Sequence, residues 1–287
     1  MSRLIRSLAV SALSAALLLS AAALPALART RTASTTGNDI SWPQCGKSYP
    51  SGQAFGIVGL TGGLANDQNG CFAKELAWAA GSSGNSLPGK VPPAMLYVNT
   101  ADPGQVVPAV KDWPINDTDP NGVTVSNPDG TTCGGADDLA CSWRYGWDRA
   151  IQDMMWLAAT SARGASNVPA DYWWWLDVET GNSWETTTAN NVADLEGMVA
   201  ALKSTNETYL GVPLGGVTTV GIYSTSYQWD QITATPSSQL VGLPDWIPGA
   251  GTLAGAQADC SLPAFTTDGR VLMTQWFGKP FDGDYAC

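Results

Sequence analysis

The stretch "YWWWLDVETGNSW" (172–184) places four aromatic residues shortly before two acidic ones, Asp177 and Glu179. An apolar run of this kind is typical of a strand that is buried on both faces. The polar residues after it are typical of a loop. Because side chains two positions apart in a strand point to the same face, Asp177 and Glu179 should project together. The stretch therefore predicts a buried strand over 172–179 with two carboxylates at its C-terminal end.

Apolar segments and helix-like segments alternate on both sides of this stretch. Further strands are predicted at 38–42, 54–62, 94–100, 219–225 and 271–278, and helices at 70–81, 143–164 and 190–204. Strands separated by helices indicate an α/β fold in which crossovers join parallel strands. An open doubly wound sheet and a closed barrel both fit this order. Length favours a single TIM-like (β/α)-barrel, whose typical size is ~250 residues, and the amphipathic helices disfavour a β-sandwich.

The first 28 residues have the three parts of a secretory signal peptide. Arg3 and Arg6 form a basic start, residues 8–24 are an apolar core, and "ALA" at 26–28 offers a cleavage site. A membrane anchor is the alternative, but the apolar core is short for a stable span. We therefore expect a secreted, extracellular protein without a membrane anchor after cleavage. Residues 29–37 are predicted to be a linker, and residues 38–287 a single catalytic-type barrel domain.

Six cysteines fit an oxidising compartment: Cys45, Cys71, Cys133, Cys141, Cys260 and Cys287. Six cysteines allow fifteen pairings, and proximity in the chain favours Cys45–Cys71, Cys133–Cys141 and Cys260–Cys287. The region 111–142, rich in Pro, Asp, Asn and Gly, is predicted to be a loop insertion held by the second of these bonds. No C-x-x-C spacing occurs and the chain has no histidine, so no metal site is predicted.

Composition excludes several classes of function. The net charge is −11, and clustered Lys and Arg are absent, which disfavours nucleic acid as a partner. The lack of histidine excludes Ser-His-Asp and Cys-His catalytic systems. No nucleotide-binding glycine motif occurs, and we expect no cofactor. The chain is predicted to be a monomer whose chemistry depends on carboxylates.

The Asp177–Glu179 pair has one chemical and one structural interpretation. Two neighbouring carboxylates raise the pKa of one of them, which then holds a proton near neutral pH. A protonated acid beside an ionised carboxylate is what glycosidic bond cleavage requires. In the structural interpretation, Asp177 caps a turn and Glu179 pairs with an arginine. For an isolated D-x-E the structural interpretation would be preferred.

Other strand ends carry residues of the same kind. Asp39 lies in "GNDISWPQCG" (37–46), Tyr223 lies in "GIYSTSYQW" (221–229), and the stretch 273–287, "MTQWFGKPFDGDYAC", contains Gln275, Trp276, Asp282 and Asp284. The strand ends of a barrel converge on one face, where active sites are built. Each of these residues alone is more often structural, but together they indicate a site.

The ordered set of motifs resembles the glycoside hydrolase family 25 lysozymes, the Chalaropsis-type muramidases. The similar segments are "DISWPQCG" (39–46), "FGIVGLTGG" (55–63), "LDVE" (176–179), "GIYST" (221–225) and "TQWFGKPFDGDY" (274–285). Each motif is weakly specific, but their order spans 38–287. Asn99, the long insertion and the number of disulfides depart from the family pattern.

The resemblance implies a role for each matching residue. Glu179 would be the general acid, and Asp177 would stabilise positive charge or orient the acetamido group of the substrate. Asp39 and Asp282 would line the site, with Asp284 an alternative to Asp282. Tyr223, Gln275 and Trp276 would contribute to substrate binding, the aromatic rings facing the sugar.

These observations predict a secreted glycoside hydrolase that cleaves peptidoglycan or a similar N-acetylhexosamine polymer. The alternative is a non-catalytic module on the same barrel that binds cell-wall glycan. A chitinase-like enzyme shares the D-x-E pattern, but it usually has more aspartates leading into the strand than "WWWLDVE" has.

Overall fold

A computed structural model describes residues 35–84, 87–88, 91–106, 112–234 and 236–287 of the chain. The predicted signal peptide, the predicted linker up to residue 34 and the first residue of the predicted insertion lie outside the described residues. No helix in the described ranges is long and apolar enough to cross a membrane.

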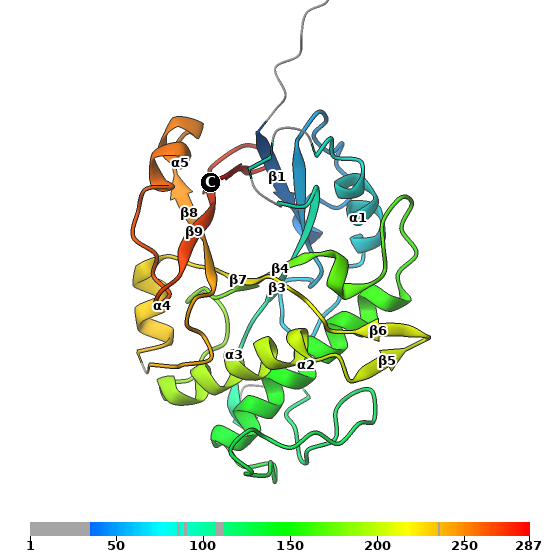
Figure 1. Cartoon of the computed structure of the whole chain (residues 1–287), viewed down its shortest axis with the longest axis vertical. Coiled ribbons are helices and arrows are strands. Elements are labelled where there is room, and N and C mark those ends of the chain that lie inside the picture. Colours follow the sequence, from blue (N-terminus) through cyan, green and yellow to red (C-terminus); the bar gives the residue numbers. More distant parts are fainter. Residues whose placement is uncertain (1–34, 85–86, 89–90, 107–111, 235) are drawn as a thin grey trace, which may run out of the picture. The chain divides into compact units, whose positions relative to one another are not determined.

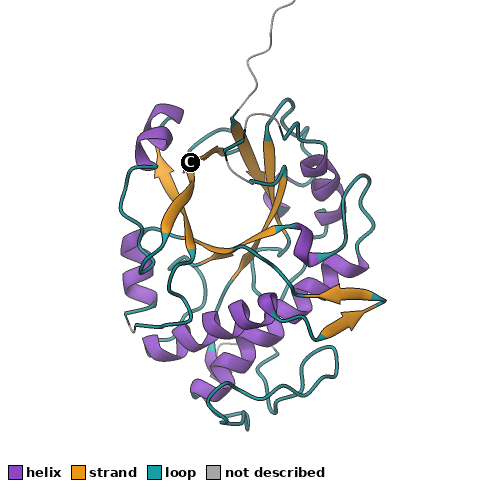
Figure 2. Cartoon of the chain, viewed as in Figure 1, coloured by secondary structure: helices purple, strands orange, loops and turns teal. Residues whose placement is uncertain are grey.

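Eight strands close into a barrel, which confirms the predicted (β/α)-barrel and excludes the open sheet (Figures 1 and 2). Around the ring they run in the order β1-β10-β9-β8-β7-β4-β3-β2. Their bounds are Thr36–Ile40 (β1), Phe55–Gly59 (β2), Ala94–Asn99 (β3), Trp173–Asp177 (β4), Val220–Tyr223 (β7), Pro244–Ala250 (β8), Arg270–Trp276 (β9) and Gly283–Ala286 (β10). β10 is antiparallel to both β1 and β9, and the other neighbouring pairs are parallel.

The helices lie outside the ring of strands, as Figure 2 shows. They are Phe72–Ala80 (α1), Leu139–Ala159 (α2), Thr188–Lys203 (α3), Ser226–Ile232 (α4) and Leu253–Asp259 (α5). Short 3-10 turns occur at Trp42–Gln44, Gly104–Val106 and Pro169–Asp171, and a separate hairpin is formed by Glu207–Tyr209 (β5) and Val212–Leu214 (β6). In the described chain only a 3-10 turn and loops connect β1 to β2, so the regular alternation of strand and helix is incomplete where the barrel closes.

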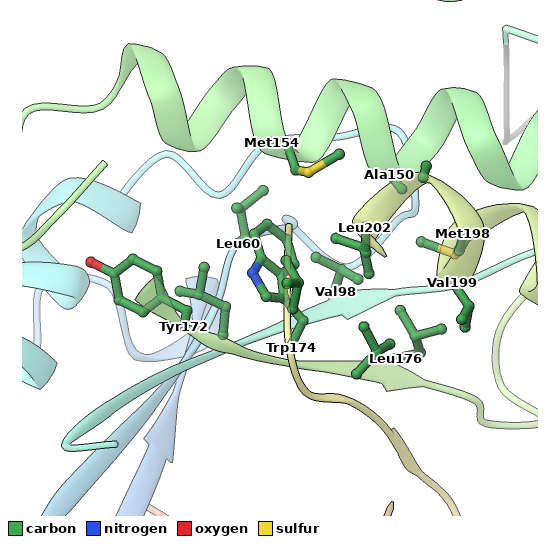
Figure 3. Close-up of a cluster of buried hydrophobic side chains, with 14 of the residues drawn as sticks. Leu60, Val98, Ala150, Met154, Tyr172, Trp174, Leu176, Met198, Val199 and Leu202 are labelled. Atoms are coloured by element: carbon green, nitrogen blue, oxygen red, sulfur yellow. The ribbon is translucent and has the colours of Figure 1, made fainter. Parts of the chain in front are cut away.

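The aromatic run of β4 serves two cores because alternate side chains face opposite sides of the barrel wall. Trp174 and Leu176 point outward and pack with Met154 of α2 and Leu202 of α3 (Figure 3). Trp175 points inward into a second apolar cluster. This inner cluster fills the barrel, as expected for a packed interior rather than a pore. The same alternation turns Asp177 inward.

The α2–α3 crossing depends on two glycines. A Cβ at Gly146 of α2 would collide with the backbone carbonyl of Asp194, and one at Gly197 of α3 would collide with the carbonyl of Trp143. The two helices therefore approach closely over the outer face of the barrel. They lie side by side in Figure 1.

Several predicted boundaries were wrong by a few residues. β4 ends at Asp177, so Glu179 lies in the following loop and not in the strand. β1 begins at Thr36, so the last two residues of the predicted linker belong to the barrel. α2 begins at Leu139 because Asp138 caps it, its Oδ1 accepting from the Cys141 N–H at 2.9 Å. It ends at Ala159, before the predicted end at Gly164.

The three predicted disulfides are confirmed. Cys45–Cys71 joins the turn after β1 to the start of α1, and Cys133–Cys141 joins the insertion to the first turn of α2. Cys260–Cys287 joins the end of α5 to the residue after β10. The insertion therefore carries a disulfide as predicted, although its last residues, from Leu139 on, belong to α2.

Candidate active site

A cavity of ≈ 200 Å³, here called the acidic cavity, opens at the C-terminal ends of the parallel strands. Its lining residues come from strands and loops far apart in the sequence: Asp39, Ser41, Gln44, Tyr97, Asp177, Glu179, Tyr223, Trp246, Gln275 and Asp282. Six of these were singled out from the sequence. The barrel thus brings together acids from the beginning, middle and end of the chain.

Asp177 is the last residue of β4, and its side chain is held from β3. Its Oδ2 accepts from Asn99 Nδ2 at 2.8 Å, and the two residues are direct partners in the β3–β4 register. Its backbone carbonyl accepts from Thr100 Oγ1 at 2.7 Å and from Asn182 Nδ2 at 2.9 Å. Burial raises the pKa of Asp177 well above its usual range, and the neighbouring charges of Glu179 and Asp39 raise it further.

Glu179 lies two residues beyond the end of β4 and still reaches the acidic cavity. The Val178 N–H donates to the Tyr223 carbonyl at 2.9 Å, which continues the β4–β7 pairing for one more residue. The carbonyl of Glu179 accepts from Trp184 Nε1 and from the Asn182 N–H. Its backbone is therefore fixed, while its half-buried side chain stays accessible beside Asp177.

A chain of hydrogen bonds crosses the cavity wall to Asp39. Tyr223 OH donates to Gln275 Oε1 at 3.0 Å, and Gln275 Nε2 donates to Asp39 Oδ2 at 2.9 Å. Burial raises the pKa of Asp39 to about 6, against the lowering effect of the Gln275 hydrogen bond. Asp39 is thus an acceptor that titrates close to neutral pH.

The two acidic residues near the end of the chain occupy different positions. Asp282 lines the cavity from the loop before β10, and its Oδ1 accepts from the Gly278 N–H at 2.8 Å. Asp284 is fully buried behind Asp39 and does not line the cavity. Burial, and then the charge of Asp39, raise the pKa of Asp284 well above its usual range, so it holds a proton that it can donate to Asp39.

The aromatic residues of the cavity differ in part from those singled out in the sequence. Tyr223 lines the cavity, and its ring lies 4.5 Å from that of Trp246 in an edge-to-face arrangement. Trp276 does not line it. Its ring lies against Gly283 of β10, where a Cβ would collide with it. Tyr97 and Trp246 line it instead, although Trp246 is only 2% exposed.

Five functional candidates were missed in the sequence: Ser41, Gln44, Tyr97, Trp246 and, as a partner of Asp177, Asn99. The alternation of β3 could have identified Tyr97, because it lies two positions before Asn99 and one strand away from Asp177. Trp246 gave no such signal, because it lies in "PDWIPGA" (244–250), where two prolines and a glycine obscure the strand.

The titratable side chains of the cavity are mainly acidic. Its lining contains four carboxyl groups and no basic side chain. In the described part of the chain, no group of three or more acidic, cysteine or histidine residues is arranged to hold a metal ion. The cavity can therefore hold and move protons, and it favours a neutral or cationic ligand over an anionic one.

Comparison with known proteins gives structural likeness only. No protein-family model matches the chain, and no curated protein matches it. The fold is similar to that of the bacterial lysozyme from Streptomyces coelicolor, with a TM-score of 0.47 and 16% identity over 89% of this chain and 93% of that chain. For the muramidase from Acremonium alcalophilum the TM-score is 0.46, with 17% identity over 88% of this chain and 93% of the other. A glycosyl hydrolase 25 of Streptococcus pneumoniae gives 0.42 and 12%, over 88% and 86% of the two chains.

Proposed function

We propose that the protein is a secreted glycoside hydrolase that cleaves a peptidoglycan-type N-acetylhexosamine polymer. The observation that carries this proposal is the Asp177–Glu179 pair in one cavity, with the raised pKa of Asp177. Burial and the neighbouring charge of Glu179 keep a proton on Asp177 above the usual carboxyl range. Glycosidic cleavage requires one carboxyl to protonate the leaving oxygen and another to act on the sugar.

The different accessibility of the two carboxyls supports different roles. Glu179 is half-buried at the cavity wall, so it is the group that meets the glycosidic oxygen and protonates it. Asp177 is 6% exposed and is held by Asn99, so it faces the sugar in a fixed orientation. In its protonated form it orients the acetamido group of the sugar, and as a carboxylate it stabilises the positive charge that develops at the anomeric carbon.

The bond changes follow from these roles. The bond between the anomeric carbon and the bridging oxygen breaks, the electron pair stays on that oxygen, and Glu179 protonates it. A water molecule then gives its hydroxyl to the anomeric carbon and its proton to Glu179. The acid is restored, and the products are two shorter glycans, one with a new reducing end.

The remaining cavity residues support sugar binding. The rings of Tyr97 and Tyr223 offer apolar surface with polar edges, which suits the faces and hydroxyl groups of a pyranose, and Trp246 packs against Tyr223 from the core. In this proposal Tyr97 provides the aromatic surface that the sequence assigned to Trp276, and Asp284 acts through Asp39. Three disulfides support an extracellular, oxidising compartment.

The test is release of reducing ends from purified peptidoglycan. The mature protein should release them, and Glu179→Gln should not, at an unchanged melting temperature. Asp230→Asn, which alters an exposed carboxyl on α4, is the matched control and should retain full activity. If neither the mature protein nor the control releases reducing ends from several cell walls and chitin, catalysis is refuted, and glycan binding by the same cavity becomes the function to test.

A further inference from the structure

A second, smaller hollow lies on the same face of the barrel. It measures ≈ 50 Å³ and is lined by residues 63–65, 99–101 and 181–183, which follow or end β2, β3 and β4. None of these residues is charged, and they include two asparagines, a threonine and a serine. The hollow is therefore neutral and polar, in contrast to the acidic cavity.

The hollow adjoins the acidic cavity through Asp177. Three of its lining residues, Asn99, Thr100 and Asn182, donate hydrogen bonds to the side chain or backbone of Asp177. A ligand that extends from the acidic cavity past Asp177 in this direction would meet the hollow next.

Trp42 lies beside both the acidic cavity and the hollow. It lies between Ser41 and Gln44, which both line the acidic cavity. Its indole lies over Gly63, the first residue of the hollow, since a Cβ on Gly63 would fall 2.8 Å from Trp42 Nε1. The indole is nevertheless 51% exposed, which is high for the largest apolar side chain.

The backbone on either side of Trp42 is held by hydrogen bonds and a disulfide. The Ser41 N–H donates to Gln44 Oε1 and the Gln44 N–H donates to the Ser41 carbonyl, both at 2.9 Å. The next residue, Cys45, is bonded to Cys71 at the start of α1. An exposed indole carried on a fixed backbone has less conformational entropy to lose when a ligand covers it than one on a mobile loop, which suits an aromatic anchor in a binding site.

We propose that Trp42 and the neutral hollow form an additional sugar subsite beside the acidic cavity. The indole stacks on the face of one pyranose ring, and the hollow receives an uncharged polar substituent of that sugar, such as an acetamido group. The volume supports a substituent rather than a ring, because it is far below the ~300–1,000 Å³ of pockets that enclose a whole drug-sized ligand. The subsite rests on the proposed function and extends it: the preferred ligand is an oligomer that spans both spaces.

Two variants test the two halves of this subsite. Trp42→Ala removes the stacking surface, and Trp42→Phe retains an aromatic face. Gly181→Leu adds a branched side chain at the edge of the hollow without backbone strain, because a Cβ at Gly181 has no atom within 4 Å and its φ lies outside the left-handed region. Matched controls in the insertion are Ile115→Ala, which removes an exposed apolar side chain, and Gly134→Leu, which adds one in open space.

The experiment is calorimetric titration with the hexamer and the dimer of N-acetylglucosamine, with every variant made in the Glu179→Gln background to prevent cleavage. We expect Trp42→Ala and Gly181→Leu to bind the hexamer about tenfold more weakly, the size of effect expected for one anchoring contact. Trp42→Phe and both controls should bind like the parent. The advantage of hexamer over dimer should shrink in the two disruptive variants.

The outcomes separate this inference from the proposed function. Hexamer affinity that is unchanged by Trp42→Ala and Gly181→Leu, or no hexamer binding by the parent, overturns the subsite. Release of reducing ends by the protein with native Glu179 is measured in parallel and decides catalysis independently. Trp42-dependent binding without release would leave the subsite standing on a non-catalytic barrel.

Discussion

Two groups of carboxyls in this barrel differ in their access to a ligand. The mouth group, Asp39, Asp177 and Glu179, lines the acidic cavity. The sealed group, Asp102, Asp153 and Asp194, is fully buried in and beside the α2–α3 layer. A raised pKa occurs in both groups, and burial is its largest cause in both.

The comparison shows that a perturbed carboxyl does not by itself identify an active site. Burial raises the pKa of Asp102 to about 8, yet this residue lines no part of the acidic cavity. In the sealed group Arg149 partly offsets the penalty for Asp153 and Asp194, whereas no basic side chain lines the cavity. Function is expected where the perturbed groups also meet open space and one another.

The largest difference between the two groups should appear in the catalytic rate when one carboxyl of each group is replaced by its amide. Glu179→Gln should reduce the rate of reducing-end release by about 10²–10⁴-fold, the usual contribution of a general acid. Asp102→Asn should leave the rate within about twofold, because Asn resembles the protonated carboxyl that burial favours. Initial rates on the same peptidoglycan check both. Equal losses in the two variants would remove the distinction between the groups.

The second prediction concerns stability as a function of pH. Burial raises the pKa of Asp102 to about 8, of Asp148 to about 7 and of Asp245 to about 6, so the folded state binds more protons than the unfolded state. Their contribution is fully present below the unfolded pKa of about 4 and is lost as the pH rises through 6 to 8. The free energy of unfolding should therefore fall between pH 5 and pH 8, by at most ~1.4 kcal/mol per pH unit for each carboxyl.

Urea denaturation at pH 5, 6.5 and 8 measures this dependence. Asp102→Asn should flatten it, because that carboxyl no longer titrates. Equal or greater stability at pH 8 would contradict the linkage. A Glu179→Gln protein should keep most of the dependence, since Asp102, Asp148 and Asp245 are intact.

A smaller effect, on stability and on the pH dependence of the rate, is expected from Gln275→Met. The change removes the donor to Asp39 and the acceptor for Tyr223. The buried groups left unpaired should lower the free energy of unfolding by about 1–3 kcal/mol. Without that hydrogen bond the pKa of Asp39 should rise above its value of about 6. The acid limb of the pH–rate profile should move to higher pH. An unchanged limb in an active variant would show that Asp39 does not control it.

The smallest effect on stability and on the pH dependence of the rate should come from Tyr223→Phe. This variant removes one donor to Gln275 and leaves the Gln275–Asp39 hydrogen bond in place. We expect a loss of stability of about 1 kcal/mol and an acid limb close to that of the parent protein. A shift as large as that of Gln275→Met would mean that Tyr223 acts on Asp39 through more than Gln275.

Strong patterns in the sequence predicted the barrel and much of the cavity. The alternation of Trp174, Trp175 and Leu176 between two cores explains why β4 appears as an unbroken apolar run. The three longest helices, α1, α2 and α3, were predicted because each has apolar residues at helical spacing. α4 and α5 were missed because seven residues make only two turns, too few for a periodic signal.

The closing strand and the aromatic positions were harder to predict. β10 has four residues and pairs antiparallel, which the expectation of parallel crossovers does not include. Trp276 and Gln275 are adjacent in a strand and cannot both face the cavity, so the period of two should have separated them. Asn99 was a departure from the family pattern, and it proves to be the side chain that holds Asp177.

Closure of the ring by β10 has a consequence for the order of events during synthesis. Gln275 and Asp39, which share a hydrogen bond, are 236 positions apart, and Asn38 and Asp282 are 244 apart. Contacts of such long range form late, because a large loop must close first. A nascent chain that ends before Asp282 has β1 without its β10 partner and lacks both Asp282 and Asp284. The acidic cavity can therefore assemble only after almost the whole barrel has been made, so the proposed glycan-cutting site would be absent from incomplete chains.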